Sequence, residues 1–132
     1  MPIKRKPELD DNGLWPVRIM YLRMSEKPKP QALPSPAIPH AIQRAEKPTV
    51  AFYRFLYDAV GRDWAWTDRK KLNDGELKEI LDDKDTEIYV LYIKGVPAGY
   101  AELNFNQFPG SVDLAYFGIM PEFIGMKLGP YF

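Results

Sequence analysis

The clearest chemical signal lies near the end of the chain, where glycines follow a strand-like stretch. Residues 111–120 read SVDLAYFGIM, and residues 121–129 read PEFIGMKLG. A strand that feeds a glycine-containing turn and then the start of a helix directs several backbone N–H groups at one point, and the helix dipole adds partial positive charge there. The sequence therefore predicts a site for an anion directly after this strand.

Other chemistries are excluded by the residue types that the chain lacks. It has no cysteine, which excludes a disulfide scaffold, Cys-ligated zinc and a thiol nucleophile. The single histidine, His40, lies among prolines, so we expect neither a His-based metal site nor a Ser-His-Asp triad. No metal cofactor is therefore expected.

The charges balance overall but not along the chain. The sequence has 18 Lys+Arg and 18 Asp+Glu; residues 1–47 carry nine basic and five acidic side chains (+4), and residues 48–132 carry nine and thirteen (−4). Neither part is basic enough to predict binding to nucleic acid. The acidic part fits either a cationic or amine substrate or a solvated surface.

Length and composition indicate one folded domain. The chain has 132 residues, of which 45% are hydrophobic and 14% aromatic, and this size suits a single core. No stretch approaches the roughly 18 apolar residues of a membrane span, and the first residues do not resemble a signal peptide. We therefore expect a cytoplasmic protein that does not bind membranes.

Prolines divide the first part of the chain. Six of the thirteen fall between Pro28 and Pro48, so residues 28–48 are predicted to form an extended connector, either a docking peptide or a spacer. Before it, residues 16–24 alternate like a strand with two apolar faces, which predicts a strand covered on both sides. Residues 1–15 are predicted to be an N-terminal extension.

Two helices are predicted after the connector. Residues 49–61 show apolar residues at helical spacing, with Thr49 suited to the N-cap and Gly61 to the C′ position. In the second helix, Asn73 and Glu76 form a capping box ahead of an apolar stripe. The two helices are expected to cover a sheet.

Three consecutive strands complete the predicted elements. Residues 87–93 and 96–104 are rich in β-branched and aromatic side chains and are joined by a two-residue turn, Lys94-Gly95, which predicts a hairpin. Residues 111–120 give the third strand, ended by Pro121. The predicted order is strand, connector, helix, helix, strand, strand, strand.

This order, together with the loop that follows it, resembles the GNAT superfamily of acyl-CoA N-acyltransferases. The resemblance covers roughly residues 16–132 and is carried by YFGIMPEFIGMKLG at 116–129 and by KGVPAGY at 94–100. The segment FYRFLYDAVGRDWAW is similar to a bacterial subgroup with no settled substrate. The resemblance implies an α/β fold with a mixed, mostly antiparallel sheet and flanking helices.

In this family the loop after the last of these strands holds the pyrophosphate of coenzyme A. The consensus Gln/Arg-x-x-Gly-x-Gly/Ala falls on residues 124–129, where isoleucine stands for Gln or Arg and lysine stands for the first glycine. That lysine is expected to crowd the phosphates, to pair with them or to face solvent. The resemblance implies acetyl-CoA as cosubstrate, bound by Ile119, Met120, Ile124, Gly125, Met126, Lys127, Leu128 and Gly129.

The resemblance implies transfer of an acyl group, most simply acetyl, to a primary amine by direct attack in a ternary complex. A backbone N–H of Ile119 or its neighbour would stabilise the oxyanion. We expect Glu102 to be the general base, because alternation places it among apolar residues beside Tyr100; the alternative is a structural ion pair. Asp113 is a second candidate base. Tyr116 would hydrogen-bond the substrate or pack in the core.

The acceptor stays open at this point. A free amino acid, a polyamine, an aminoglycoside or a peptide N-terminus would all satisfy these residues. Trp64 and Trp66 are expected either to floor the substrate pocket or to anchor the turn between the helices on the sheet.

The chain ends early relative to the family. Phe132 falls within the first turns of the expected helix, so the C-terminal part of the fold, including the strand that borders the acyl group, is missing. This predicts an N-terminal or truncated portion with an unpaired strand edge, which favours pairing with another chain, for instance as a homodimer. A competing hypothesis is a non-catalytic interaction protein built on the same half-fold.

Overall fold

The computed structural model describes residues 8–29 and 33–132. The chain divides into an N-terminal unit, Met1–Ala32, and a domain, Leu33–Phe132. In the described part of the first unit, the Asp10 side chain accepts hydrogen bonds from the backbone N–H groups of Asn12 and Leu14 at 2.9 and 2.8 Å. Residues 15–29 contain no helix or strand.

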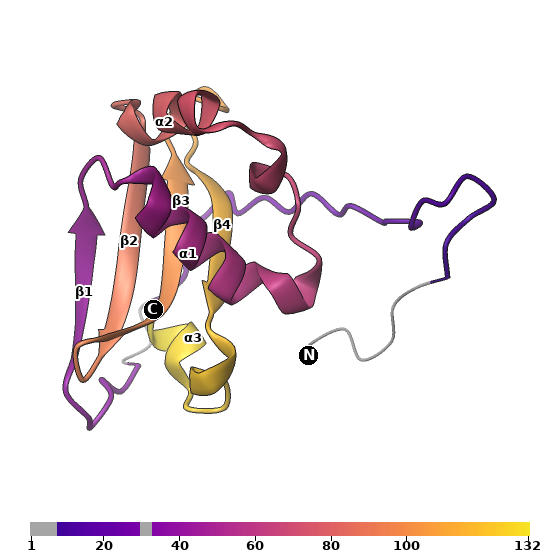
Figure 1. The fold of residues 1–132 in the computed structure, drawn as a ribbon. Coiled ribbons are helices and arrows are strands. Elements are labelled where there is room, and N and C mark those ends of the chain that lie inside the picture. Colours follow the sequence, from indigo (N-terminus) through magenta and orange to yellow (C-terminus); the bar gives the residue numbers. More distant parts are fainter. Residues whose placement is uncertain (1–7, 30–32) are drawn as a thin grey trace. The chain divides into compact units, whose positions relative to one another are not determined.

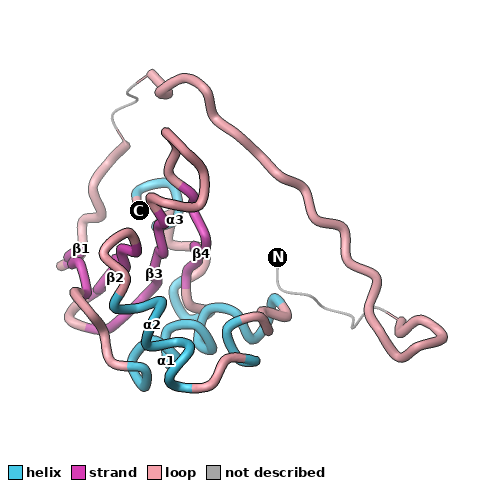
Figure 2. Tube along the Cα trace, turned by 90° about the horizontal axis from the view of Figure 1, so that it is seen from above, coloured by secondary structure: helices cyan, strands magenta, loops and turns pink. Residues whose placement is uncertain are grey.

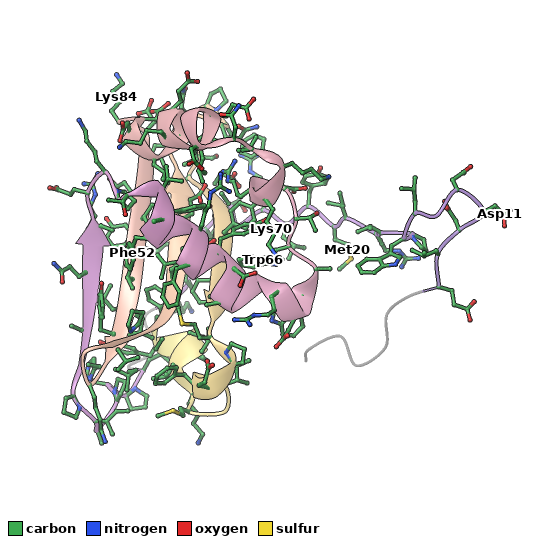
Figure 3. The ribbon with its side chains drawn as sticks, viewed as in Figure 1. Asp11, Met20, Phe52, Trp66, Lys70 and Lys84 are labelled. Carbon is green, nitrogen blue, oxygen red and sulfur yellow. The ribbon has the colours of Figure 1, made fainter. Side chains whose placement is uncertain are left out.

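The strand predicted over residues 16–24 is wrong. Its apolar side chains are exposed, with Val17 at 78%, Tyr21 at 86% and Met20, labelled in Figure 3, at 74%. Alternating apolar residues make a strand only where a neighbouring strand satisfies the backbone N–H and C=O groups. In the structure the neighbour of the hairpin comes from elsewhere, inside the predicted connector.

The first strand, β1, is His40–Ala45. It pairs antiparallel with β2, Thr86–Ile93, from His40↔Ile93 to Ala45↔Ile88. The stretch between Pro39 and Pro48 has no proline, so every backbone donor that the pairing needs is present. The prolines that predict a connector therefore flank a strand instead of excluding one.

The two predicted helices are confirmed. Helix α1 is Val50–Gly61, and the Thr49 hydroxyl accepts a hydrogen bond from the Phe52 N–H at 3.2 Å. The prediction for Gly61 is wrong, because it is the last helical residue with φ −91°. A Cβ there would lie 2.6 Å from the Trp66 side chain, so close packing is what requires this glycine.

Helix α2, Asp74–Asp82, begins with the predicted capping box. The Asn73 Oδ1 accepts from the Glu76 N–H, and Glu76 Oε2 accepts from the Asn73 N–H, both at 2.9 Å. We expect Asn73→Ala to lower the free energy of unfolding by about 1 kcal/mol, measured by urea denaturation. Asn106→Ala, in an exposed loop, is the control; equal stability of the two variants would contradict this role for Asn73.

The sheet contains β1, β2, β3 (Val96–Asn104) and β4 (Asp113–Ile119), in the order β1-β2-β3-β4, with every pair antiparallel. Figure 1 shows the strands side by side in this order. The Lys94-Gly95 turn has positive φ at both residues, 50° and 79°, as a two-residue hairpin turn requires. The predicted hairpin, third strand and mixed α/β class are therefore confirmed.

Helices α1 and α2 cover one face of the sheet (Figure 2). Short 3₁₀ turns at Arg62–Trp64 and Arg69–Lys71 connect them. The core on this face contains Tyr53, Leu56, Tyr57, Ala59, Val60, Leu77, Leu81, Ile88, Val90, Tyr100 and Met120.

A smaller cluster lies on the opposite face. There Leu91, Ile93 and Ala98 pack with Leu128 of the single-turn helix α3, Leu128–Tyr131. A 3₁₀ turn, Pro121–Phe123, joins β4 to this region. Within residues 8–29 and 33–132, no helix has both the length and the apolar character needed to cross a membrane.

Candidate functional site

Glu102 lies at the centre of the helix-covered face of the sheet. Its side chain is on β3, 1% exposed, and opposite Tyr116 of β4. The Tyr53 hydroxyl, from α1, donates to Oε1, and Arg69 Nη2 donates to Oε2 at 2.6 Å. Helix, inter-helix segment and sheet are thus joined at one buried carboxylate.

This geometry makes Glu102 part of a structural ion pair with Arg69. Both carboxylate oxygens are engaged, and the group has almost no accessible surface. Burial alone lowers the pKa of Arg69, but the Glu102 carboxylate raises it more, and the net pKa lies above the ordinary value. Arg69 is therefore charged, and the general-base role of Glu102 stays a prediction.

Asp113, the second candidate base, lies at the start of β4, opposite Asn104 of β3. It is partly exposed and well away in register from Gly118 and Ile119 at the other end of the strand. The structure therefore does not bring it together with the predicted cofactor-binding residues.

Tyr116 belongs to an aromatic cluster against the helices. Its ring centroid is 5.2 Å from that of Tyr57 and 5.1 Å from that of Trp66, and the Arg69 guanidinium carbon lies 5.2 Å from the centre of its ring. Trp66 also contacts Tyr100 edge-on, with centroids 6.3 Å apart. These contacts fix Trp66, which follows α1 on the segment leading to Lys70 (Figure 3).

Two buried tyrosines, Tyr53 and Tyr100, and the partly buried Tyr116 make the fold sensitive to alkali. Burial raises the pKa of Tyr53, Tyr100 and Tyr116, and the Glu102 carboxylate raises that of Tyr53 further. Their stabilisation is fully present below the unfolded tyrosine pKa of about 10 and is lost as pH rises above it. We expect a lower free energy of unfolding at about pH 11 than at about pH 8, measured by urea denaturation, with tyrosinate absorbance reporting ionisation of the tyrosines. Equal free energies at the two pH values would contradict this burial.

A backbone donor faces the open side of β4. The Met120 N–H donates to the Ala98 carbonyl at 2.7 Å. Antiparallel strands alternate hydrogen-bonded and non-hydrogen-bonded pairs, so the preceding pair, Gly99 with Ile119, exchanges no hydrogen bond. The Ile119 N–H therefore points away from β3, and β4 has no strand beyond it in the described sheet.

An apolar groove lies at this open side. It has a volume of about 570 Å³ and runs between the end of α1, the segment after it and β4. Trp64 and Trp66 both line it, and Trp66 also packs against the core, so both alternatives stated for this pair stay open. The lining residues are Val60, Trp64, Trp66, Phe117, Gly118, Ile119 and Ile124.

The loop after β4 continues from the groove. Gly125 and Lys127 have positive φ, 92° and 59°, and the N–H groups of residues 125–127 donate to no described residue. The Ile124 N–H donates to the Pro121 carbonyl at 3.3 Å, so it is not free for an anion. Of the other predicted cofactor-binding residues, Met120 and Leu128 are buried, Met126 is exposed and Gly129 lies within α3.

The left-handed conformation of Lys127 disfavours a residue with a Cβ. We expect Lys127→Gly to raise the free energy of unfolding by about 1 kcal/mol, because glycine adopts positive φ without this cost. Urea denaturation measures it. Lys84→Gly is the control at a described loop lysine without positive φ, and a stabilisation of similar size there would contradict the explanation.

The two residues that bind the Glu102 carboxylate, Arg69 and Tyr53, were not predicted as site residues. The sequence presents Arg69 as part of a basic run that reads as solvated, and Tyr53 as one of several apolar positions on α1. Packing of α1 and the inter-helix segment on the sheet brings both to Glu102. In the described residues no group of three or more His, Asp or Glu side chains is placed to hold a metal ion.

No protein-family model matches the chain, and no curated protein matches it. Function is therefore argued from the geometry at the end of β4.

Proposed function

We propose that the chain provides the acyl-CoA-binding part of an N-acyltransferase that moves an acetyl group from acetyl-CoA to a primary amine. The observation that carries the proposal is the juxtaposition at the end of β4. Residues 117–127 supply a backbone N–H that faces the open edge, one side of the apolar groove, and a loop with free N–H groups, and Val60, Trp64 and Trp66 complete the groove.

The chemistry of these groups suits the reaction. N–H groups without a protein acceptor fit phosphate oxygens, and the Lys127 side chain adds a cation to the same loop. In the transfer step the neutral amine attacks the thioester carbonyl, a C–N bond forms, and the C–S bond breaks. The departing thiolate takes the proton that the nitrogen loses as the amide forms, which gives coenzyme A as the free thiol. The Ile119 N–H is the donor for the carbonyl oxygen as it gains negative charge.

No side chain is assigned as the proton acceptor. Glu102 is enclosed by Tyr53 and Arg69, and we assign it to positioning: it ties the segment that carries Trp66 to the sheet. The attacking ammonium loses its proton to water before transfer, and an apolar groove favours this loss because it disfavours the charged form of the amine.

A thiol-release assay tests the proposal. The protein has no cysteine, so it adds no thiol of its own to the assay, and the rate without amine gives the hydrolysis background. We expect amine-dependent release of coenzyme A together with an acetylated amine identified by mass spectrometry. Absence of both across amino acids, polyamines, aminoglycosides and apolar amines would contradict the function.

A second candidate is an interaction protein that pairs through β4, most simply as a homodimer. The open edge of β4 and exposed apolar side chains on the adjoining face, Leu114 at 55% and Phe117 at 37%, favour it. Sedimentation velocity distinguishes the two. A stable dimer that binds no acetyl-CoA would favour this candidate, and a monomer that binds acetyl-CoA would exclude it.

A further inference from the structure

The groove beside β4 has walls of one chemical kind. All seven described residues that line it are apolar or glycine, and none carries a charge. Its volume of about 570 Å³ falls among small-molecule sites. We propose, on the basis of the proposed function, that this groove binds the acceptor and that the acceptor is a monoamine with an aromatic or branched aliphatic body.

Charge excludes polyamines and aminoglycosides from this groove. Each carries several ammonium groups, and every one that enters an apolar site without a carboxylate partner loses hydration without compensation. The lining contains no aspartate or glutamate. A monoamine has one ammonium, which escapes the cost by losing its proton, and the neutral amine is the nucleophile that transfer needs.

The aromatic walls are held in place before any ligand binds. Trp66 packs against Tyr57, Tyr100 and Tyr116, with ring centroids 5.1 to 6.3 Å apart. Gly118 lets α1 approach β4, since a Cβ there would lie 2.2 Å from Val60 Cγ1. A ring placed between such fixed aromatic surfaces gains contact area without a cost for ordering the wall.

The groove also borders the donor assigned to the carbonyl oxygen. Ile119 lines the groove, and its N–H faces the same open edge. An amine whose apolar body fills the groove is thereby held next to the thioester carbonyl.

The indole N–H groups of the three tryptophans provide a direct binding readout by NMR. Trp64 and Trp66 line the groove, and Trp15 belongs to the N-terminal unit and is an internal control. We expect phenylethylamine and isoamylamine to shift the Trp64 and Trp66 signals and to leave that of Trp15 unchanged, with no such shift from spermidine. Shifts caused by spermidine alone, or by none of the amines, would overturn the proposal.

A pair of variants locates the binding. Ile124→Asp places a carboxylate in the lining, gives an ammonium a partner there, and is expected to permit spermidine binding. Met126→Asp introduces the same charge two residues further along the loop, at a side chain of similar exposure, 44% against 48%, that does not line the groove. Equal effects of the two substitutions would contradict binding in the groove.

Activity separates this inference from the proposed function. Acetylation of phenylethylamine in preference to spermidine supports both. Preferential acetylation of spermidine would support the acyltransferase and overturn the acceptor class. Phenylethylamine binding without any transfer from acetyl-CoA would overturn the proposed function, and with it the assignment of the bound amine as an acceptor.

Discussion

Replacement of Glu102 by alanine is expected to lower the free energy of unfolding by about 3–5 kcal/mol. The substitution leaves the Arg69 guanidinium without its carboxylate, 2.6 Å from Nη2 to Oε2 in the intact protein, and removes the acceptor of the Tyr53 hydroxyl. A largely buried charge that loses its partner costs far more than the pair contributed. Urea denaturation followed by circular dichroism measures the change.

Two further variants make the result specific. Asp82→Ala removes an exposed i,i+4 ion pair with Lys78 and is expected to cost at most about 0.5 kcal/mol. The double variant Glu102→Leu/Arg69→Met removes both charges and is expected to recover most of the lost stability. A double variant no more stable than Glu102→Ala alone would contradict the uncompensated-charge explanation.

Gly118→Ala is expected to cost about 1–3 kcal/mol. The new Cβ would lie 2.2 Å from Val60 Cγ1, so α1 must shift away from β4. Because Val60 and Gly118 both line the groove, the same substitution is expected to weaken amine binding there. Chemical denaturation and the indole NMR shifts report the two effects separately.

A double-mutant cycle tests the cause. Val60→Ala removes the atom that the new methyl group meets, so Val60→Ala/Gly118→Ala is expected to be more stable than the sum of the single changes implies. Gly129→Ala is the matched control, since a Cβ there meets nothing within 4 Å. Strictly additive effects of the first pair would show that the contact between α1 and β4 is not the source of the cost.

The elements with a local signal could be predicted from sequence. The capping box of Asn73 with Glu76 depends on residues three apart, and the Lys94-Gly95 turn depends on two adjacent residues. The apolar spacing of residues 49–61 depends on one helix face. Such signals do not require knowledge of what lies across the sheet.

The first strand could not be found in this way. Within β1 most side chains are exposed, so the strand shows no apolar alternation and is defined by backbone pairing with β2. Residues 16–24 show the reverse, a strong alternation with no described partner strand. Apolar alternation predicts which side chains a strand would bury, and it does not show that a partner strand is present.

Only the part of the candidate site with a local sequence signal could be predicted. Residues 119–129 are contiguous, so their turn glycine and the strand before them were visible in the sequence. The partners of Glu102 come from positions 33 and 49 residues earlier, and no local pattern pairs them. The role of Glu102 therefore depends on how α1 and the inter-helix segment pack against β3, which no local pattern reveals.

The most direct test of the central claim, acetyl-CoA binding at the end of β4, is the melting temperature with and without saturating acetyl-CoA. We expect an increase of several degrees, because a ligand at about 100 times its Kd adds about 2.7 kcal/mol. The increase should shrink when Gly125 is replaced by valine, which disfavours the positive φ of the loop. A cooperative transition whose midpoint is unchanged at every acetyl-CoA concentration would contradict acetyl-CoA binding at the end of β4.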